Sequence, residues 1–458
     1  MSYKPRQRVL AAWMTGILVA GMAACGSDKS SKSSTSAATP ESAVSTTGAA
    51  STTAASAAST SGAASTTAGS TASTTGAAST TPGATTPSAP TGTPVLIYTT
   101  LPLGQFLAEP GVPAIMQARI DRLNAEGGIG GHPVKLKACN NNFDPNATDK
   151  CARDAIADGA VAMVAMYDAF GATAPILEKA GIPVIAPIVT VATDNALKNL
   201  FPIDGLLDTW FGGLATAADQ AGCKKVGLVG AEFAAVTYYQ DLFEAGWSKL
   251  GNKVEGRYVL ATTVADPSAV VQAATANTDC LMLNIGADAL VGLVNRMKQV
   301  GATQRILVGA GTVSQQLITD SGGATSPLNG MILSSAFPSL DNPAFAPMLS
   351  DIAKYASGNK DIHPERSPEK MGWLGVESFA QVASMIKGDI TAASVLAAFK
   401  TGKVDLHGAR PKIDFSAPAP IPTLPRSVSP DIWFLQVKAG KIVDLSTQFV
   451  DVSKLLTK

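Results

Sequence analysis

Histidine and cysteine are scarce in this chain. Its 458 residues include only 3 histidines and 5 cysteines. His132, His363 and His407 are far apart in the sequence, none stands at the spacing of a metal ligand pair, and there is no C-x-x-C pair. Zinc sites gather Cys and His ligands at short, regular spacings. The sequence therefore predicts no metal centre.

Net charge is also lacking. The chain has 35 Lys+Arg against 35 Asp+Glu, so its formal charge is close to zero. Proteins that bind nucleic acid or an anionic membrane surface carry a clear excess of basic residues. The composition therefore argues against nucleic acid as a partner.

The motifs of common enzyme classes are missing as well. A dinucleotide-binding fold needs G-x-G-x-x-G directly after its first strand. The nearest pattern, "GAGTVS" at 309–314, has only the first two glycines and comes late in the chain. We find no G-x-S-x-G, H-E-x-x-H or S-x-x-K motif in a suitable strand–turn–helix context. We expect the protein not to be an enzyme and to use no cofactor.

The longest early apolar run is too short to span a membrane comfortably. Val9–Gly21 follows a basic start and falls short of the ~20 apolar residues that a span requires. The small residues Ala23 and Ala24 then precede Cys25, a pattern that resembles a bacterial lipobox. Residues 1–25 are predicted to be a lipoprotein signal peptide, with Cys25 lipidated to anchor the chain. The alternative is an ordinary secretory signal with an incidental cysteine.

Aromatic residues are absent from the next segment, residues 26–93. It consists almost entirely of Ser, Thr, Ala, Gly and Pro. Such a composition cannot bury enough apolar surface to offset its chain entropy, so it predicts a disordered tether. A coil of this length has an end-to-end distance of ~45 Å. Its Ser, Thr and Pro content also fits O-glycosylation.

The four cysteines beyond Cys25 are an even number in an exported chain, which favours two disulfides. Cys139 and Cys151 would close a short loop between a strand and the next helix. Cys223 and Cys280 each precede an apolar strand and could meet at one end of a sheet. Four cysteines allow three pairings, and we favour Cys139–Cys151 with Cys223–Cys280.

From Pro94 onward, short apolar runs alternate with amphipathic stretches. This βα alternation predicts parallel sheets covered by helices on both faces. It pauses near Phe201–Leu207 and then restarts, so two α/β lobes are expected, and the C-terminal third supplies the pieces that finish both sheets. The expected strands are 95–98, 134–138, 160–166, 182–188, 224–230, 254–260, 280–286 and 305–311.

Three stretches carry a family resemblance. "LNAEGGIGGHPVKL", "CNNNFDPNATDKCARDAIADGAVAMVA" and "GIPVIAPIV" resemble the type 1 periplasmic-binding-protein family, and within it the branched-chain amino-acid (Leu/Ile/Val) receptors of ABC importers. The resemblance covers about Pro94–Ser446. It implies two doubly wound parallel-sheet lobes, joined by a three-crossover hinge, that close on a ligand between them. Lobe 1 would comprise 94–203 and 336–430, and lobe 2 would comprise 204–335 and 431–458.

The same resemblance implies a function. The chain would be an extracytoplasmic, lipid-anchored receptor. It would act as a monomer that captures a small solute and delivers it to ABC permease subunits in the membrane. A ligand sensor or wall-associated binding protein that is not coupled to import remains the alternative.

The ligand site is expected beyond the carboxyl ends of the strands, where open parallel sheets bind their ligands. The glycine-rich "NAEGGIGGHPVKL" stretch would lie at the opposite edge, as a turn between helix and strand. The expected ligand-binding residues are Tyr167, Asp168, Ala169, Phe170, Thr190, Tyr238, Gly286 and Ala310.

Ala310 occupies the position where amino-acid-binding members carry an acidic residue for the ligand ammonium. A buried ammonium without an anionic partner is strongly disfavoured. Either Asp168 replaces that acid from lobe 1, or the ligand is not an α-amino acid. Other interpretations stay open: Asp168 could cap the following helix, Phe170 and Tyr238 could be core residues, and Thr190 could be an ordinary strand-end residue.

Overall fold

The computed structural model describes residues 89–458, with gaps at 105–107, 189–190, 233, 262–265 and 457–458. The predicted signal peptide, Cys25 and the tether up to residue 88 lie outside the described residues. In the described part of the chain, no helix has the length and apolar character needed to cross a membrane.

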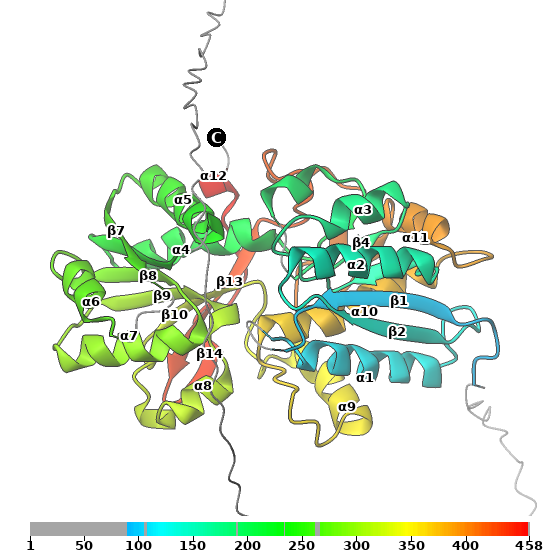
Figure 1. Cartoon of the computed structure of the whole chain (residues 1–458), viewed down its shortest axis with the longest axis horizontal. Helices are drawn as coiled ribbons and strands as arrows, with labels where there is room; N and C mark the ends of the chain where they lie inside the picture. Colours follow the sequence, from blue (N-terminus) through cyan, green and yellow to red (C-terminus); the bar gives the residue numbers. More distant parts are fainter. Residues whose placement is uncertain (1–88, 105–107, 189–190, 233, 262–265, 457–458) are drawn as a thin grey trace, which may run out of the picture. The chain divides into compact units, whose positions relative to one another are not determined.

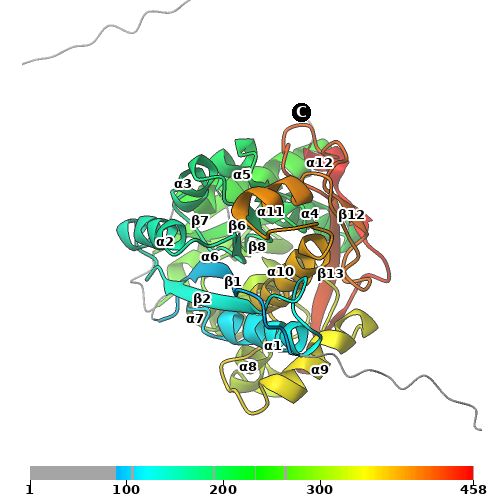
Figure 2. The same cartoon turned by 90° about the vertical axis from the view of Figure 1, so that its right-hand side faces the viewer.

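The first sheet contains five parallel strands in the order β2-β1-β3-β4-β5. Helices α1 and α10 pack into the apolar cluster on one face, whereas α2 and α3 pack into the cluster on the other face (Figures 1 and 2). The strands are β1 (Val95–Leu101), β2 (Val134–Asn140), β3 (Ala162–Val164), β4 (Val184–Ile185) and β5 (Leu200–Phe201). Their helices are α1 (Gly111–Ala125), α2 (Pro145–Ala157), α3 (Thr173–Lys179), α9 (Ala346–Tyr355), α10 (Ser367–Ala383) and α11 (Ala392–Phe399).

The second sheet runs in the order β14-β13-β10-β9-β8-β6-β7, and β15 pairs with β13. Its strands β6 to β10 are parallel, whereas β13 and β14 are antiparallel additions from the C-terminal part. The strands are β6 (Val226–Ala231), β7 (Val254–Leu260), β8 (Cys280–Asn284), β9 (Arg305–Gly309), β10 (Ile332–Ser335), β13 (Asp431–Lys438), β14 (Lys441–Asp444) and β15 (Val450–Asp451). The helices are α4 (Leu206–Gln220), α5 (Ala234–Lys249), α6 (Ser268–Thr275), α7 (Ala287–Gln299), α8 (Gln315–Asp320) and α12 (Ser453–Leu456).

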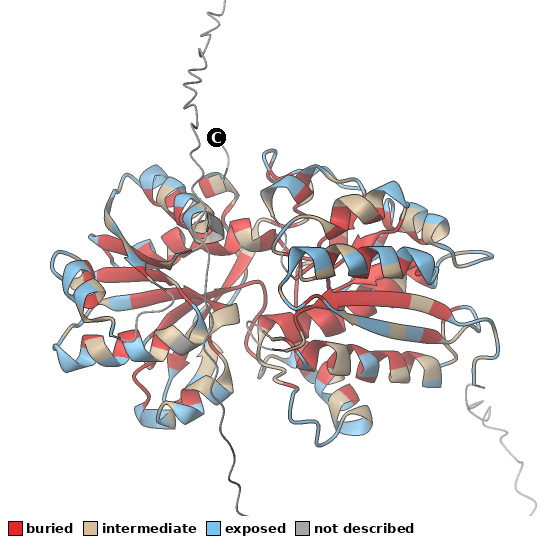
Figure 3. Cartoon of the chain, in the orientation of Figure 1, coloured by how far each residue is buried: buried red, intermediate tan, exposed pale blue. Residues whose placement is uncertain are grey.

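Helix α10 returns from the second sheet to the first and is buried almost all round, as Figure 3 shows by its red ribbon. Its glycines permit this close approach. A Cβ on Gly372 would lie 2.9 Å from a methyl carbon of Val112, and one on Gly375 would lie 2.9 Å from a methyl carbon of Val164. The helix is therefore wedged between α1 and β3, which carries its N-terminus to the carboxyl edge of the first sheet.

The chain passes between the two sheets three times: after β5, after β10, and before β13. Buried Arg410 joins these crossings, because its Nη1 donates to the carbonyls of Ala336 (2.7 Å) and Asp431 (3.0 Å). Burial raises the pKa of Asp204 on the first crossing, and the charge of Arg410 opposes that rise. One guanidinium thus faces all three crossings of the predicted hinge.

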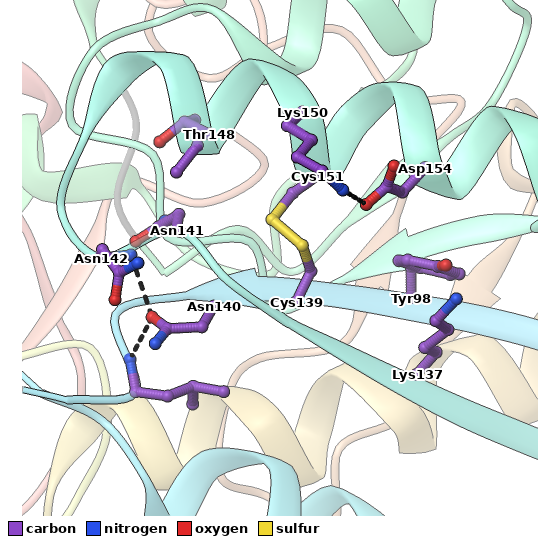
Figure 4. The surroundings of a disulfide bond; sticks show 12 residues. Tyr98, Lys137, Cys139, Asn140, Asn141, Asn142, Thr148, Lys150, Cys151 and Asp154 are labelled. Atoms are coloured by element: carbon purple, nitrogen blue, oxygen red, sulfur yellow. Dashed lines mark hydrogen bonds and ion pairs between the residues drawn. A yellow bond between two sulfur atoms is a disulfide. The ribbon is translucent and has the colours of Figure 1, made fainter.

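Both favoured disulfides are present. Cys139 on β2 is bonded to Cys151 on α2, and Figure 4 shows the two side chains pointing toward one another. Cys223, just before β6, is bonded to Cys280 at the start of β8. Asp279 lies beside this second pair, but the sulfurs are bonded to each other and the carboxylate accepts the amides of Lys224 and Lys225. The predicted pairing is confirmed.

The glycine-rich turn also behaves as predicted. Gly127 has a φ of 104° directly after α1, and Ile129 is 1% exposed. The amide of Ile129 donates to the carbonyl of His132, and the amide of His132 donates back, both at 2.9 Å. The turn therefore connects helix to strand at the amino edge of the first sheet.

Candidate functional site

Tyr167 lies at the carboxyl edge of the first sheet, three residues after β3. Its amide donates to the carbonyl of Thr100 (2.8 Å), near the end of β1. Its side chain is half-buried, and its ring makes an edge contact with that of Phe143 at 6.3 Å. Parallel strands β1 and β3 end together here, as a ligand site of this architecture requires.

Asp168 is fully buried, and both of its carboxylate oxygens are used within its own loop. Oδ1 accepts the amides of Phe170 (2.8 Å) and Gly171 (3.1 Å). Oδ2 accepts those of Ala172 (3.0 Å) and Thr173 (2.7 Å). This arrangement orders the entry into α3, and it favours the capping interpretation over an ammonium partner.

The next two residues of this loop differ in exposure. Ala169 is half-buried, whereas Phe170 is 41% exposed and touches Phe143 edge-on at 5.3 Å. The interpretation of Phe170 as a core residue is therefore wrong. Its ring is available at the surface of the same edge.

Thr190 lies outside the described residues, but Asp194 nearby was missed by the sequence analysis. Asp194 is fully buried, and its Oδ2 accepts the amide of Val191 at 3.3 Å. Its Oδ1 has no hydrogen-bond partner among the described residues. Burial raises the pKa of Asp194 to about 6, the Val191 amide opposes this, and the charge of Asp168 adds to it.

A second missed group surrounds Arg366, at the start of α10. Arg366 donates to Glu109 Oε1 at 2.7 Å and to Glu369 Oε1 at 3.3 Å. The other oxygen of each glutamate is buried and has no partner among the described residues. Burial raises the pKa of both carboxyls, to about 8 for Glu369, even though Arg366 opposes the rise. Nothing in the local sequence links Glu109 to a helix more than 250 residues away.

Two observations indicate that the second sheet lies near the carboxyl edge of the first sheet. Burial raises the pKa of Tyr167, and the negative charge of Glu109 and the nearby Tyr239 of α5 raise it further. The amide of Gln315, at the start of α8, donates to Glu365 Oε1 at 2.9 Å. The segments after β6 and β9 therefore lie near the residues that follow β1 and β3.

The edge of the second sheet is mainly aromatic. The Tyr238 hydroxyl donates to Asp208 Oδ1, and the Tyr239 ring stacks on Phe211 with centroids 4.4 Å apart. Tyr238 is half-buried, so it is not a simple core residue. Burial, followed by the charge of Asp208, raises the pKa of Tyr238.

Gly286 and Ala310 complete the predicted set. Gly286 precedes α7, is exposed, and a Cβ built on it would meet no heavy atom within 4 Å. Ala310 is 6% exposed and belongs to the apolar cluster of the second sheet. Position 310 therefore carries no acid and is surrounded by apolar side chains.

Two cavities in the described part of the chain do not involve the predicted residues. One, of about 420 Å³, lies between the Ile129–His132 turn and the C-terminal end of α10, at the amino edge of the first sheet. The other, of about 410 Å³, is lined by Gln315, Leu340, Glu365 and the β13–β14 turn. The second one adjoins the proposed edge through Glu365.

A family model described as "Periplasmic binding protein" matches residues 95–441, most of the chain. The chain belongs to this family. The type 1 fold and the periplasmic binding protein family are confirmed, whereas the branched-chain amino-acid branch stays a prediction. A periplasmic family supports the predicted extracytoplasmic location. No curated protein matches the chain.

Several solved structures have a fold similar to that of this periplasmic binding protein. A possible leucine/isoleucine/valine-binding protein from Rhodopirellula baltica SH 1 has a TM-score of 0.67 and 14% identity, covering 77% of this chain and 96% of its own. The branched-chain amino acid transporter substrate binding protein LivJ from Streptococcus pneumoniae, in complex with isoleucine, has a TM-score of 0.64 and 16% identity, with 78% and 99% covered. An ABC transporter solute binding protein from R. palustris, in complex with 4-hydroxybenzoate, has a TM-score of 0.64 and 14% identity, with 78% and 97% covered. At these identities the likeness shows the fold alone.

Proposed function

We propose that this chain is the solute-binding lipoprotein of an ABC importer. Lobe 1 (94–203 and 336–430) and lobe 2 (204–335 and 431–458) would close about the hinge on a small amino-acid-like, carboxylate or amide solute. The closed monomer would then dock on permease subunits.

The observation that carries this proposal is the meeting of the two carboxyl edges, where the Gln315 amide, at the start of α8, donates to Glu365 Oε1 at 2.9 Å. Open parallel sheets bind ligands at these edges, and Tyr239 contributes to the raised pKa of Tyr167. The family match covers both edges. Relatives of the same fold are described with isoleucine and with 4-hydroxybenzoate, which agrees with a site that combines polar acceptors and aromatic rings.

A thermal-shift screen of amino acids, amides, aromatic acids and short-chain carboxylates tests the proposal. A solute that binds the folded state raises the apparent melting temperature by mass action. Small-angle scattering of the liganded protein should show compaction. A tight ligand that causes no compaction would contradict hinge closure.

The lipid anchor is a separate part of the proposal. It rests on the small residues Ala23 and Ala24 before Cys25, and the 26–93 tether would separate the lobes from the membrane. Replacing Cys25 by Ser should release the protein from the membrane fraction. Equal retention of the variant would contradict lipidation at this residue.

Coupling to import is tested in cells. Deletion of the gene should strongly reduce uptake of the solute found in the screen, because the permease would lose the protein that delivers it. Unchanged uptake together with a lost transcriptional or growth response would favour the sensor alternative.

A further inference from the structure

Glu109 is a carboxylate at the first edge whose hydrogen bonding is incomplete. It lies between β1 and α1, where its amide donates to the Pro102 carbonyl at 2.7 Å. The residue is 4% exposed, and Oε1 is held by Arg366 at 2.7 Å. Oε2 is buried and has no partner among the described residues. Since nearly all buried polar atoms in native proteins are hydrogen-bonded, we expect this oxygen to accept a hydrogen bond from a further donor.

Three other groups that could hold a cationic solute are already occupied or apolar. Both oxygens of Asp168 accept amides of its own loop. Glu365 accepts the Gln315 amide. Ala310 carries no charge at all. Asp194 Oδ1 and Glu369 Oε2 are also buried without a partner in the described part of the chain. Both of these residues are 0% exposed, however, whereas Glu109 is 4% exposed and is therefore the most accessible of the three.

The local charge balance leaves room for one more cation. Arg366 is shared between the carboxylates of Glu109 and Glu369. The neighbouring Lys370 is engaged elsewhere, because its Nζ donates to the Pro338 carbonyl at 2.8 Å and lies over the Phe345 ring. The charges of three carboxylates, Glu109, Glu369 and Glu365, act on Arg366, so a cationic donor at Glu109 Oε2 would offset part of this negative charge.

Tyr167 provides a second independent feature. Its half-buried ring lies within electrostatic reach of both Glu109 and the Tyr239 ring. A protonated amine next to an aromatic face gains cation–π attraction in addition to its hydrogen bond. An apolar or flat solute body would fit between the two tyrosines.

We propose that Glu109 Oε2 accepts a hydrogen bond from the protonated primary amine of the solute, with the solute body between Tyr167 and Tyr239. This inference rests on the proposed solute-binding function. It assigns the selection of amine-bearing solutes to lobe 1, and it makes Glu109 the anionic partner that position 310 does not supply.

Matched solutes test the inference on the unaltered full chain. Calorimetric titration would compare phenylalanine with 3-phenylpropanoate, and leucine with 4-methylpentanoate, because each pair differs only by the amine. We expect the amine-bearing member of at least one pair to bind at least tenfold more tightly. Binding of the deaminated acids with equal or higher affinity would overturn the inference but leave solute capture intact. Absence of binding by all four solutes would overturn it too, while a hit elsewhere in the wider screen would still support the proposed function.

Two variants locate the effect. Glu109→Gln keeps the shape and should reduce amine affinity at least tenfold, while changing that of the deaminated acids by less than twofold. Glu377→Gln is the matched control: Glu377 is equally buried and bound by Arg119 at 2.6 Å, but its oxygens are occupied by Arg119, Arg122 and Gln381. Equal losses in both variants, or none in Glu109→Gln, would overturn the assignment. If Glu109→Gln does not fold, the comparison of matched solutes still decides.

Discussion

The two carboxyl edges of this protein are built differently. The edge of the first sheet carries the buried carboxylates Glu109, Asp168 and Asp194. The edge of the second sheet presents Tyr238 and Tyr239 and, at Ala310, an apolar core residue. The first edge therefore holds most of these buried carboxylates, whereas the second edge holds one, Asp208, beside its tyrosines. A hinge that brings the edges together would complete one site from two unlike halves.

Within the first edge, the same residue type serves two purposes. Asp168 is saturated by four loop amides and holds the backbone in place. Glu109 and Asp194 each keep one buried oxygen without a partner in the described part of the chain. A carboxylate that is satisfied by its own loop contributes stability, whereas one with a free oxygen is available to a ligand.

The disulfides offer the largest contrast between the lobes. Cys223–Cys280 joins residues 57 positions apart, whereas Cys139–Cys151 joins residues 12 apart. Loop-closure entropy of the unfolded chain predicts a loss of about 4 kcal/mol for removing the longer link and about 3 kcal/mol for the shorter one. Urea denaturation of the two double Cys→Ala variants measures both losses. A larger loss for the shorter link would show that native-state effects outweigh loop entropy.

Asp168→Ala tests how much the loop of Asp168, at the first edge, contributes to stability. It deprives four amides of their acceptor, so the free energy of unfolding should fall by about 3 kcal/mol. Asp208→Ala on the second edge removes a single acceptor, that of the Tyr238 hydroxyl, and should cost about 1 kcal/mol. Equal costs in denaturant titrations would contradict the proposed difference between the edges.

The raised pKa of Asp194, at the first edge, predicts that the free energy of unfolding depends on pH. Its pKa is about 6 in the folded protein and near 3.8 when unperturbed. Between these values the unfolded chain releases the proton first, so the folded state is progressively destabilised as pH rises from about 4 to 6. Asp194→Asn should abolish this loss and stabilise the protein at pH 7 by about 2–3 kcal/mol relative to the parent. A stability difference that stays constant from pH 4 to 7 would contradict the assignment.

The sequence was sufficient for the fold but not for the site. Apolar runs alternating with amphipathic stretches predict both parallel sheets, and cysteines placed before neighbouring strands predict their pairing. Glu109 was not predicted as a site residue because its partner Arg366 lies 257 residues away, and no local sequence pattern indicates such a contact. An acid just before the first predicted helix, at the carboxyl end of the first strand, was the available signal. For Asp168, capping and ligand binding predict the same residue type, so only the loop geometry separates them.

Tyr238→Phe is the smallest and most local test of the second edge. It removes the hydroxyl that donates to Asp208, a buried carboxyl whose pKa is raised by burial while this hydrogen bond lowers it. Loss of the bond should cost about 1 kcal/mol, and the cost should grow as pH rises, because the hydrogen bond stabilises the ionised form of the carboxylate. A double-mutant cycle with Asp208→Ala, which removes the acceptor, measures the coupling. Additive effects of the two substitutions would mean that the hydroxyl and the carboxylate act independently, and the second edge would then contribute its rings alone.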